Sequence, residues 1–86
     1  MTNYPSLFEQ FLREECTPEV RRLIMDATTH RDPGRLRREF EFNRFDLELD
    51  FERGVATIQD VTDASEKGSI SVALSNLVEG IRGLDR

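Results

Sequence analysis

Cysteine, histidine, lysine and tryptophan are scarce in this chain. Its 86 residues include one cysteine, one histidine and one lysine, and no tryptophan. A single cysteine excludes a disulfide within the chain, and the lack of a cysteine and histidine cluster excludes a structural zinc site. No apolar run approaches the roughly 20 residues that a membrane-spanning helix needs. We therefore expect a single soluble domain over residues 1–86, located in the cytoplasm and not in a membrane.

Side chains that could carry out chemistry are equally few. A general base needs a positioned partner and a nearby nucleophile, and His30 has only Asp32 close to it in sequence. We expect His30 to lie on the surface at the end of a helix. Cys16 has no histidine near it, so we expect a small buried residue. The glycines are scattered and form no phosphate-binding loop. These residues therefore predict no enzyme activity, no cofactor and no metal site.

Acidic residues outnumber basic ones and concentrate in the middle of the chain. There are 17 Asp and Glu residues against 12 Lys and Arg residues, which gives a formal net charge of -5. That balance argues against a nucleic-acid-binding protein, whose surface is normally basic. Residues 39–67 hold nine acidic and three basic residues, whereas the segments on either side are close to neutral. The middle third therefore decides the electrostatic character of the protein.

Two helices are expected in the first third of the chain. Apolar residues recur at helical spacing near the N-terminus, which predicts a helix over residues 5–15 with Ser6 in position to cap it. Thr17 is a good N-cap and Pro18 suits the first helical position, so a second helix should begin there and end by residue 28 or 29. The expected buried stripe of the second helix is formed by Val20, Leu23, Ile24 and Ala27.

From Leu36 the apolar residues recur with a period of two, which predicts a β-strand with one apolar face. The alternation changes phase at Asn43 and Arg44. Two geometries explain this change and stay open. A two-residue turn would form a hairpin that pairs Phe42 with Phe45, whereas a β-bulge would keep one long strand. The polar face of the first strand carries Arg37, Glu39 and Glu41.

Further strands and a final helix complete the expected fold. With Arg53 and Gly54 as a loop, residues 55–61 form a returning strand in which Ile58 faces Leu49. Residues 69–72 predict a short edge strand. A helix should follow over residues 72–82, with Ser71 as its N-cap and Gly83 as its stop. The order predicts an α+β domain: an antiparallel β-meander of three strands, with a short fourth, packed against two N-terminal helices and one C-terminal helix.

An acidic row follows from the alternation of polar and apolar residues between 46 and 52. In a strand, its carboxylates would all point outward, and like charges at this spacing repel each other without helping the fold. Three interpretations stay open: a solvated face that discourages edge-to-edge aggregation, a binding face for a cationic protein, and a divalent-cation site, although a flat row does not converge on an ion. The row consists of Asp46, Glu48, Asp50 and Glu52, and we expect Asp60, Asp63 and Glu66 to lie in an acidic loop.

The one basic cluster stands beside aromatic residues, an arrangement that can bind single-stranded nucleic acid. Phe40 and Phe42, however, have the alternation that suits the core, so no free stacking surface remains. We expect the arginines to pair locally with Glu39, Glu41 or the acidic row, and we expect no nucleic-acid partner. The cluster is formed by Arg31, Arg35, Arg37 and Arg38.

The second half of the chain resembles a known group of proteins. Residues 40–61 read FEFNRFDLELDFERGVATIQDV and are followed by an acidic loop and an apolar helix. This pattern, with the small size and the acidity, resembles the immunity proteins of bacterial toxin systems, in particular those of contact-dependent growth inhibition. Such proteins bind a cognate toxin domain, often a basic nuclease, and block its active site or substrate surface. The resemblance implies partner-binding roles for Asp46, Glu48, Asp50, Glu52, Asp60, Asp63 and Glu66.

The sequence therefore predicts a non-enzymatic protein-binding module. Its acidic sheet face and loop would bind a basic protein partner such as a toxin domain. The alternative is a small structural or self-associating domain whose acidic face is only solvated. A monomer and a homodimer are both compatible with the sequence.

Overall fold

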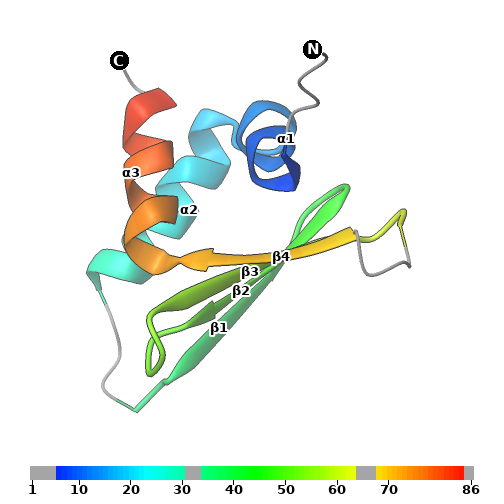
Figure 1. The fold of residues 1–86 in the computed structure, drawn as a ribbon. Helices are drawn as coiled ribbons and strands as arrows, with labels where there is room; N and C mark the ends of the chain where they lie inside the picture. The colour runs from blue at the N-terminus through cyan, green and yellow to red at the C-terminus, as the bar shows by residue number, and fades with distance from the viewer. Residues whose placement is uncertain (1–5, 31–33, 64–67, 85–86) are drawn as a thin grey trace.

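The computed structural model describes residues 6–30, 34–63 and 68–84. The chain forms two helices, a four-stranded antiparallel sheet and a third helix, so the predicted α+β class and element order are confirmed. All three helices lie on one face of the sheet (Figure 1). The elements are α1 (Leu7–Glu14), α2 (Pro18–Thr29), β1 (Arg37–Glu41), β2 (Phe45–Asp50), β3 (Val55–Asp60), β4 (Ser69–Ala73) and α3 (Leu74–Leu84).

The first two helices begin at the caps that the sequence predicts. The hydroxyl of Ser6 accepts a hydrogen bond from the backbone N–H of Glu9 at 3.1 Å. The hydroxyl of Thr17 accepts one from the backbone N–H of Val20 at 3.3 Å, and Pro18 follows at the first helical position. Each cap satisfies a backbone donor that the helix itself leaves unpaired.

The β1–β2 connection is a hairpin, which settles the choice that the sequence left open. The backbone N–H of Phe42 donates to the carbonyl of Phe45 at 3.0 Å, across a two-residue turn. At the other end of the ladder, the N–H of Phe51 donates to the carbonyl of Leu36 at 2.8 Å. Phe40 therefore lies opposite Leu47, and the apolar residues of both strands share one face.

The β2–β3 register differs by two residues from the predicted one. Leu49 faces Ala56 rather than Ile58, and Asp50 faces Val55, which leaves a four-residue loop. The loop is longer because the carboxylate of Asp50 accepts hydrogen bonds from two loop N–H groups, while Gly54 takes a φ of 68°. A shift of two residues keeps every side chain on its predicted face.

The fourth strand is present, and it changes where the last helix begins. Ser71, predicted to cap that helix, lies within β4, and its hydroxyl is 3.1 Å from the hydroxyl of Thr57. α3 begins at Leu74, three residues after Ser71. The backbone N–H of Leu74 donates to the carbonyl of Gly54 at 2.8 Å. The helix continues through Gly83, the predicted stop, to Leu84.

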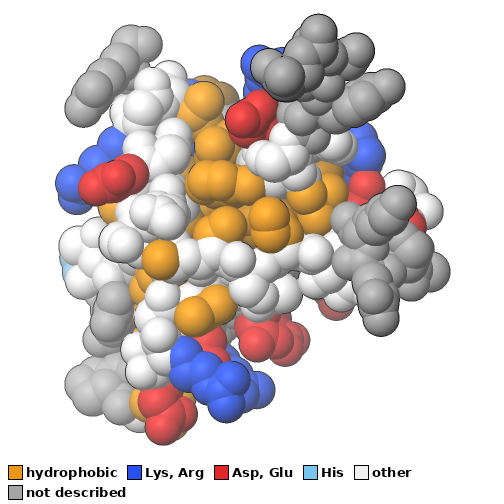
Figure 2. All heavy atoms as spheres, in the orientation of Figure 1, with side chains coloured by type: hydrophobic (Ala, Val, Ile, Leu, Met, Phe, Trp, Pro, Cys, Tyr) orange, Lys and Arg blue, Asp and Glu red, His pale blue; other side chains and the backbone are white. Residues whose placement is uncertain are grey.

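The hydrophobic core lies between the inner face of the sheet and the helices. Phe11 and Phe45 meet at its centre in an edge-to-face contact, with ring centroids 5.7 Å apart. Full burial of each large apolar side chain contributes about 1.5–3 kcal/mol. Figure 2 shows hydrophobic side chains gathered between α1 and α3, above β4, with acidic and basic side chains below the sheet. The largest fully buried residues are Phe11, Phe45, Ile24, Leu47, Leu49, Ile58, Leu77 and Ile81.

The prediction that Leu23 of α2 lies in the core is wrong. Ile24 and Ala27 are buried and Val20 is half-buried, but the side of the helix that carries Leu23 faces outward, and Leu23 is 51% exposed.

In the described parts of the chain, no helix is long and apolar enough to cross a membrane.

Candidate functional site

Four carboxylates form a compact group on the outer face of the sheet, and we name this group the carboxylate block. It arises because the hairpin places Glu39 of β1 directly opposite Glu48 of β2, and Glu41 directly opposite Asp46. Directly opposed residues have Cβ atoms about 4.5–5.5 Å apart, and same-side neighbours along a strand lie about 6–7 Å apart. The block consists of Glu39, Glu41, Asp46 and Glu48.

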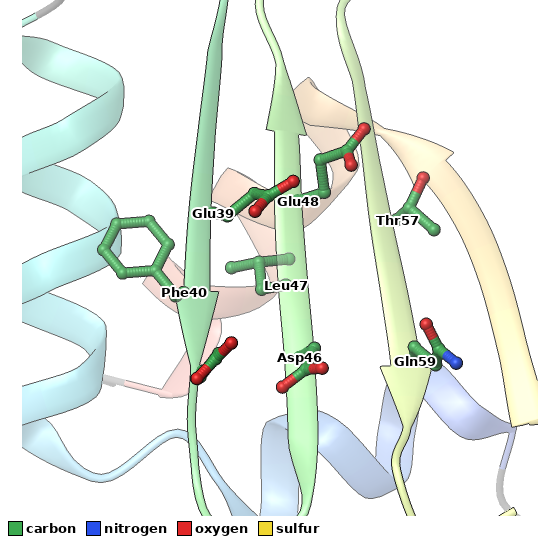
Figure 3. A pocket seen from close by; sticks show the side chains of 8 residues that line it. Glu39, Phe40, Asp46, Leu47, Glu48, Thr57 and Gln59 are labelled. Atoms are coloured by element: carbon green, nitrogen blue, oxygen red, sulfur yellow. The ribbon is translucent and has the colours of Figure 1, made fainter.

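A shallow hollow of about 170 Å³ lies at the block. Figure 3 views it from the side away from the helices, with Glu39 and Glu48 in one row across the strands. The rows continue onto β3, where Thr57 lies beside Glu48 and Gln59 lies beside Asp46. The block on β1 and β2 is therefore bordered on β3 by uncharged side chains that can form hydrogen bonds.

Among the described residues, no cation forms an ion pair with the block, and Arg37, which lies on the same face of β1, pairs with Asp50 instead. The ion pairs between described residues involve other carboxylates, those of Glu14, Asp26, Asp50 and Asp60. Like charges directly opposite each other in a sheet destabilise it, at the scale of a few tenths of a kcal/mol to about 1 kcal/mol per pair. The sheet thus carries two opposed acid pairs that destabilise it and that have no ion-pair partner within residues 6–30, 34–63 and 68–84.

Asp50, one of the seven predicted partner-binding residues, has an internal role instead. Its side chain is 12% exposed, and the guanidinium Nε of Arg37 lies 3.8 Å from its Oδ2. Its Oδ1 accepts hydrogen bonds of 3.1 Å from the backbone N–H groups of Glu52 and Arg53. These contacts hold the β2–β3 loop, so the carboxylate of Asp50 is not part of the open acidic face.

Asp60 is also held inside the fold. Its side chain is 5% exposed, and its Oδ2 accepts hydrogen bonds from Arg44 Nε at 3.2 Å and Nη2 at 2.8 Å. Its Oδ1 accepts from the backbone N–H and the hydroxyl of Thr62. The hydrogen bonds from Arg44, followed by those from Thr62, lower the pKa of Asp60 to about 2.

Arg44 connects the hairpin turn to α1 as well as to β3. Its Nη1 donates to Glu14 at 2.8 Å, and its Nη2 lies 3.3 Å from the side-chain oxygen of Gln10. Its backbone N–H donates to the buried carboxylate of Glu15 at 2.9 Å. Sequence reasoning missed both Arg44 and Glu15, because their partners are about 30 residues away in the chain.

The remaining predicted residues do not form one surface. Glu52 is exposed on the β2–β3 loop. Asp63 is half-buried after β3, where its backbone N–H donates to the carbonyl of Asp60. Glu66 lies outside the described residues. Asp46 and Glu48 are thus the predicted residues that belong to the block.

Glu39 and Glu41 belong to the block although they were not predicted as site residues. The sequence contained part of the signal, because the alternation places both residues on the polar face of the first strand. The hairpin pairing seen in the structure then brings that face beside Asp46 and Glu48. The open choice between hairpin and bulge hid this neighbourhood.

The basic cluster divides between the acidic row and the aromatic residues. Arg37 pairs with Asp50, as local pairing with the acidic row predicted. The guanidinium carbon of Arg38 lies 5.1 Å from the ring centroid of Phe40, and Phe40 stacks on Phe42 at 5.8 Å. Both rings are half-buried against the core, in agreement with their predicted position. Arg35 is exposed, and Arg31 lies outside the described residues.

The two candidate chemical groups have the surroundings that the sequence predicts. Cys16 is buried, and this burial raises the pKa of its thiol to about 12. His30 is exposed at the end of α2, with its Nδ1 2.9 Å from the carboxylate of Asp26. Within residues 6–30, 34–63 and 68–84, no group of three or more His, Cys, Asp or Glu side chains is placed to hold a metal ion.

Comparisons with protein-family models, with curated proteins and with solved structures found no match to this chain. The similarity to immunity proteins therefore stays a prediction from the sequence pattern.

Proposed function

We propose that this protein is a non-enzymatic binding module whose carboxylate block binds a basic surface of a partner protein. The observation that carries the proposal is the pairing of Glu39 with Glu48 and of Glu41 with Asp46, with no ion pair to a cation of the described residues. Folding gains nothing from these pairs, because opposed like charges destabilise a sheet. A feature that weakens the fold is typical of a functional surface.

Lysine and arginine side chains of a partner would remove this repulsion. Each cation that approaches the block meets two or more carboxylates within a few ångströms, so the local potential favours a basic surface. The same negative potential accelerates diffusional encounter with a basic partner and disfavours acidic ones. Thr57 and Gln59 beside the block supply hydrogen-bonding groups at its margin.

The partner class that fits best is a basic toxin domain. Proteins that bind or cleave nucleic acid carry positively charged surfaces, to which a dense array of carboxylates is complementary. The similarity of residues 40–61 to immunity proteins supports the same class. In this role the protein would act in the cytoplasm of a bacterial cell and neutralise its cognate toxin.

Self-association through the outer sheet face is disfavoured by the same geometry. Two copies packed face to face would bring two carboxylate blocks together, and the repulsion within each block would be joined by repulsion between them.

The proposal is tested by capture of the partner from the source cell on immobilised protein. Three forms are compared: the wild type, E39Q/E48Q in the block, and E9Q/E79Q as a control. Glu9 and Glu79 are exposed residues outside the block, so both variants lose the same net charge. We expect a basic protein to be retained by the wild type and by the control but not by E39Q/E48Q.

Growth measurements identify the role of the captured protein. Expressed alone, it should slow growth, and co-expression of the wild type should restore growth while E39Q/E48Q should not. Equal retention of the partner by folded E39Q/E48Q would contradict the proposal.

A further inference from the structure

β1 is an edge strand with one row of backbone groups directed away from the sheet. The bonded pairs at Phe42–Phe45 and Leu36–Phe51 fix the alternation along the β1–β2 ladder. The N–H and C=O groups of every second residue therefore point outward. Among the described residues, no backbone group pairs with this outward row. The row belongs to Arg37, Glu39 and Glu41.

The charges at this edge make it selective. Unpaired edges attract other strands, and proteins commonly blunt them with charged side chains. Here Glu39 and Glu41 contribute both the outward backbone groups and half of the carboxylate block. A strand added at this edge would place alternate side chains directly beside them on the outer face. Acidic side chains there are repelled and lysine or arginine side chains are attracted.

An apolar groove lies on the helix side of the same strand. It has a volume of about 470 Å³ and runs between α2 and Phe42, with Val20 and Leu23 as its other apolar walls and Glu19, Arg22 and Asp26 completing its lining. Phe40, which stacks on Phe42, extends from β1 away from β2 (Figure 3). Leu23 is 51% exposed, although the sequence pattern predicts it to be buried. The remaining side chains of an added strand would lie on this side of the sheet, and those beside Phe42 would meet the groove.

The two sides of the edge thus favour different residues. The outer side favours lysine or arginine, and the inner side favours valine, isoleucine, leucine or phenylalanine. A β-strand alternates its side chains in the same way.

We propose that the partner binds by adding an extended segment, with basic and apolar residues in alternation, to the free edge of β1. The basic residues lie beside the carboxylate block, and the apolar residues lie against Phe42 and Leu23. Backbone hydrogen bonds hold the segment, and the two rows of side chains select its sequence. This inference rests on the proposed function and specifies how the block takes up its partner.

A synthetic peptide of alternating lysine and valine is the probe. We expect it to bind with a salt-dependent affinity in isothermal titration calorimetry. Two further peptides carry N-methyl groups, on the lysine amides in one and on the valine amides in the other. Only one of these two sets of amides can donate to β1, because the amides of successive strand residues point to opposite edges. One methylated peptide should bind at least about tenfold more weakly than the parent, and the other should bind like the parent.

Variants of the protein test the groove and the edge separately. Leu23→Ser should weaken peptide binding about tenfold, whereas Val61→Ser, at a residue of similar exposure outside the groove, should leave it unchanged. Glu39→Pro removes the outward N–H of residue 39, a change that an edge strand tolerates. This variant should bind the peptide more weakly than Glu39→Ala does. Both Glu39 variants lose the same carboxylate, and circular dichroism checks that each is folded.

The outcomes separate the inference from the proposed function. If both methylated peptides bind like the parent while E39Q/E48Q still weakens binding, the edge inference is overturned and the acidic face stands. Failure of the parent peptide to bind also overturns the inference. A dimer that forms without peptide and is lost in Glu39→Pro would show a second copy at the edge, which overturns it as well. The proposed function fails when a basic partner binds E39Q/E48Q and the wild type equally.

Discussion

Two nitrogens of the Arg44 guanidinium donate to one oxygen of Asp60, Nε at 3.2 Å and Nη2 at 2.8 Å. This contact joins the β1–β2 turn to the end of β3. The acidic residues look alike in the sequence, but in the structure they fall into two kinds: those with an internal partner and those of the carboxylate block. Asp50 and Asp60 are held by the fold, whereas in the carboxylate block Glu39 and Glu41 are exposed and Asp46 and Glu48 are half-buried.

The Arg44–Asp60 contact predicts a pH dependence of stability. Because the pKa of Asp60 is about 2 in the folded protein and near 4 in the unfolded chain, the unfolded state binds the proton first as the pH falls. The stabilisation is complete above about pH 4 and is lost towards about pH 2. Urea unfolding of the wild type and Asp60→Asn should show the largest difference in free energy near pH 7. A difference that stays the same at about pH 2 would contradict this role.

Asp50 should stabilise the β2–β3 loop through its acceptor oxygen. Asp50→Ala leaves the N–H groups of Glu52 and Arg53 without their acceptor and should lower the free energy of unfolding by about 1–3 kcal/mol. Asp50→Asn keeps an oxygen acceptor and should lower it less. Chemical denaturation measures both variants, and equal losses would show that the charge, not the acceptor geometry, matters.

Neutralising the block should make the protein more stable. E39Q/E48Q removes one opposed pair of like charges and should raise the free energy of unfolding by a few tenths of a kcal/mol to about 1 kcal/mol at low salt. The gain should shrink in high salt, which screens exposed charges. E9Q/E79Q should give no gain, since Glu9 lies in the first turn of α1 and favours that helix end. Destabilisation by E39Q/E48Q would reveal an internal role for these carboxylates.

Two glycines of α3 should differ sharply in their tolerance of a side chain. A Cβ at Gly80 would lie 3.0 Å from the Phe8 ring and 3.1 Å from Leu12, because α1 and α3 pack closely there, whereas Gly83 has open space. Gly80→Leu should cost about 1–3 kcal/mol through overpacking. Gly83→Leu should be neutral or slightly stabilising, since leucine is a better helix former. Thermal unfolding compares the two, and equal Tm values would contradict this packing.

Local patterns predicted the elements and their faces well. Caps at Ser6 and Thr17 act within three residues, and the period of two marks strand faces without further information. The β2–β3 register was wrong because the loop length depends on Asp50, whose side chain could equally have faced solvent. The start of α3 was wrong because Ser71 suits either a cap or an edge strand, and pairing with Thr57 decides between them.

The candidate site was only partly predictable from the sequence. Acidic residues at alternate positions look equivalent until tertiary partners are known. Arg37 reaches Asp50, which removes this carboxylate from the predicted row, and Arg44 reaches Asp60, which removes it from the predicted acidic loop. Glu39 and Glu41 enter the block through hairpin pairing, which Asn43 and Arg44 signal less clearly than a glycine-containing turn would.

The most direct test of the central claim is the association rate constant of the captured basic partner with three forms of the protein. The wild type and E9Q/E79Q should associate at similar rates, because the control keeps the carboxylate block. E39Q/E48Q has the same net charge as the control but lacks one opposed pair of the block, so its association at low salt should be several-fold slower. Equal association rates for E39Q/E48Q and E9Q/E79Q would contradict the claim that the block binds the partner.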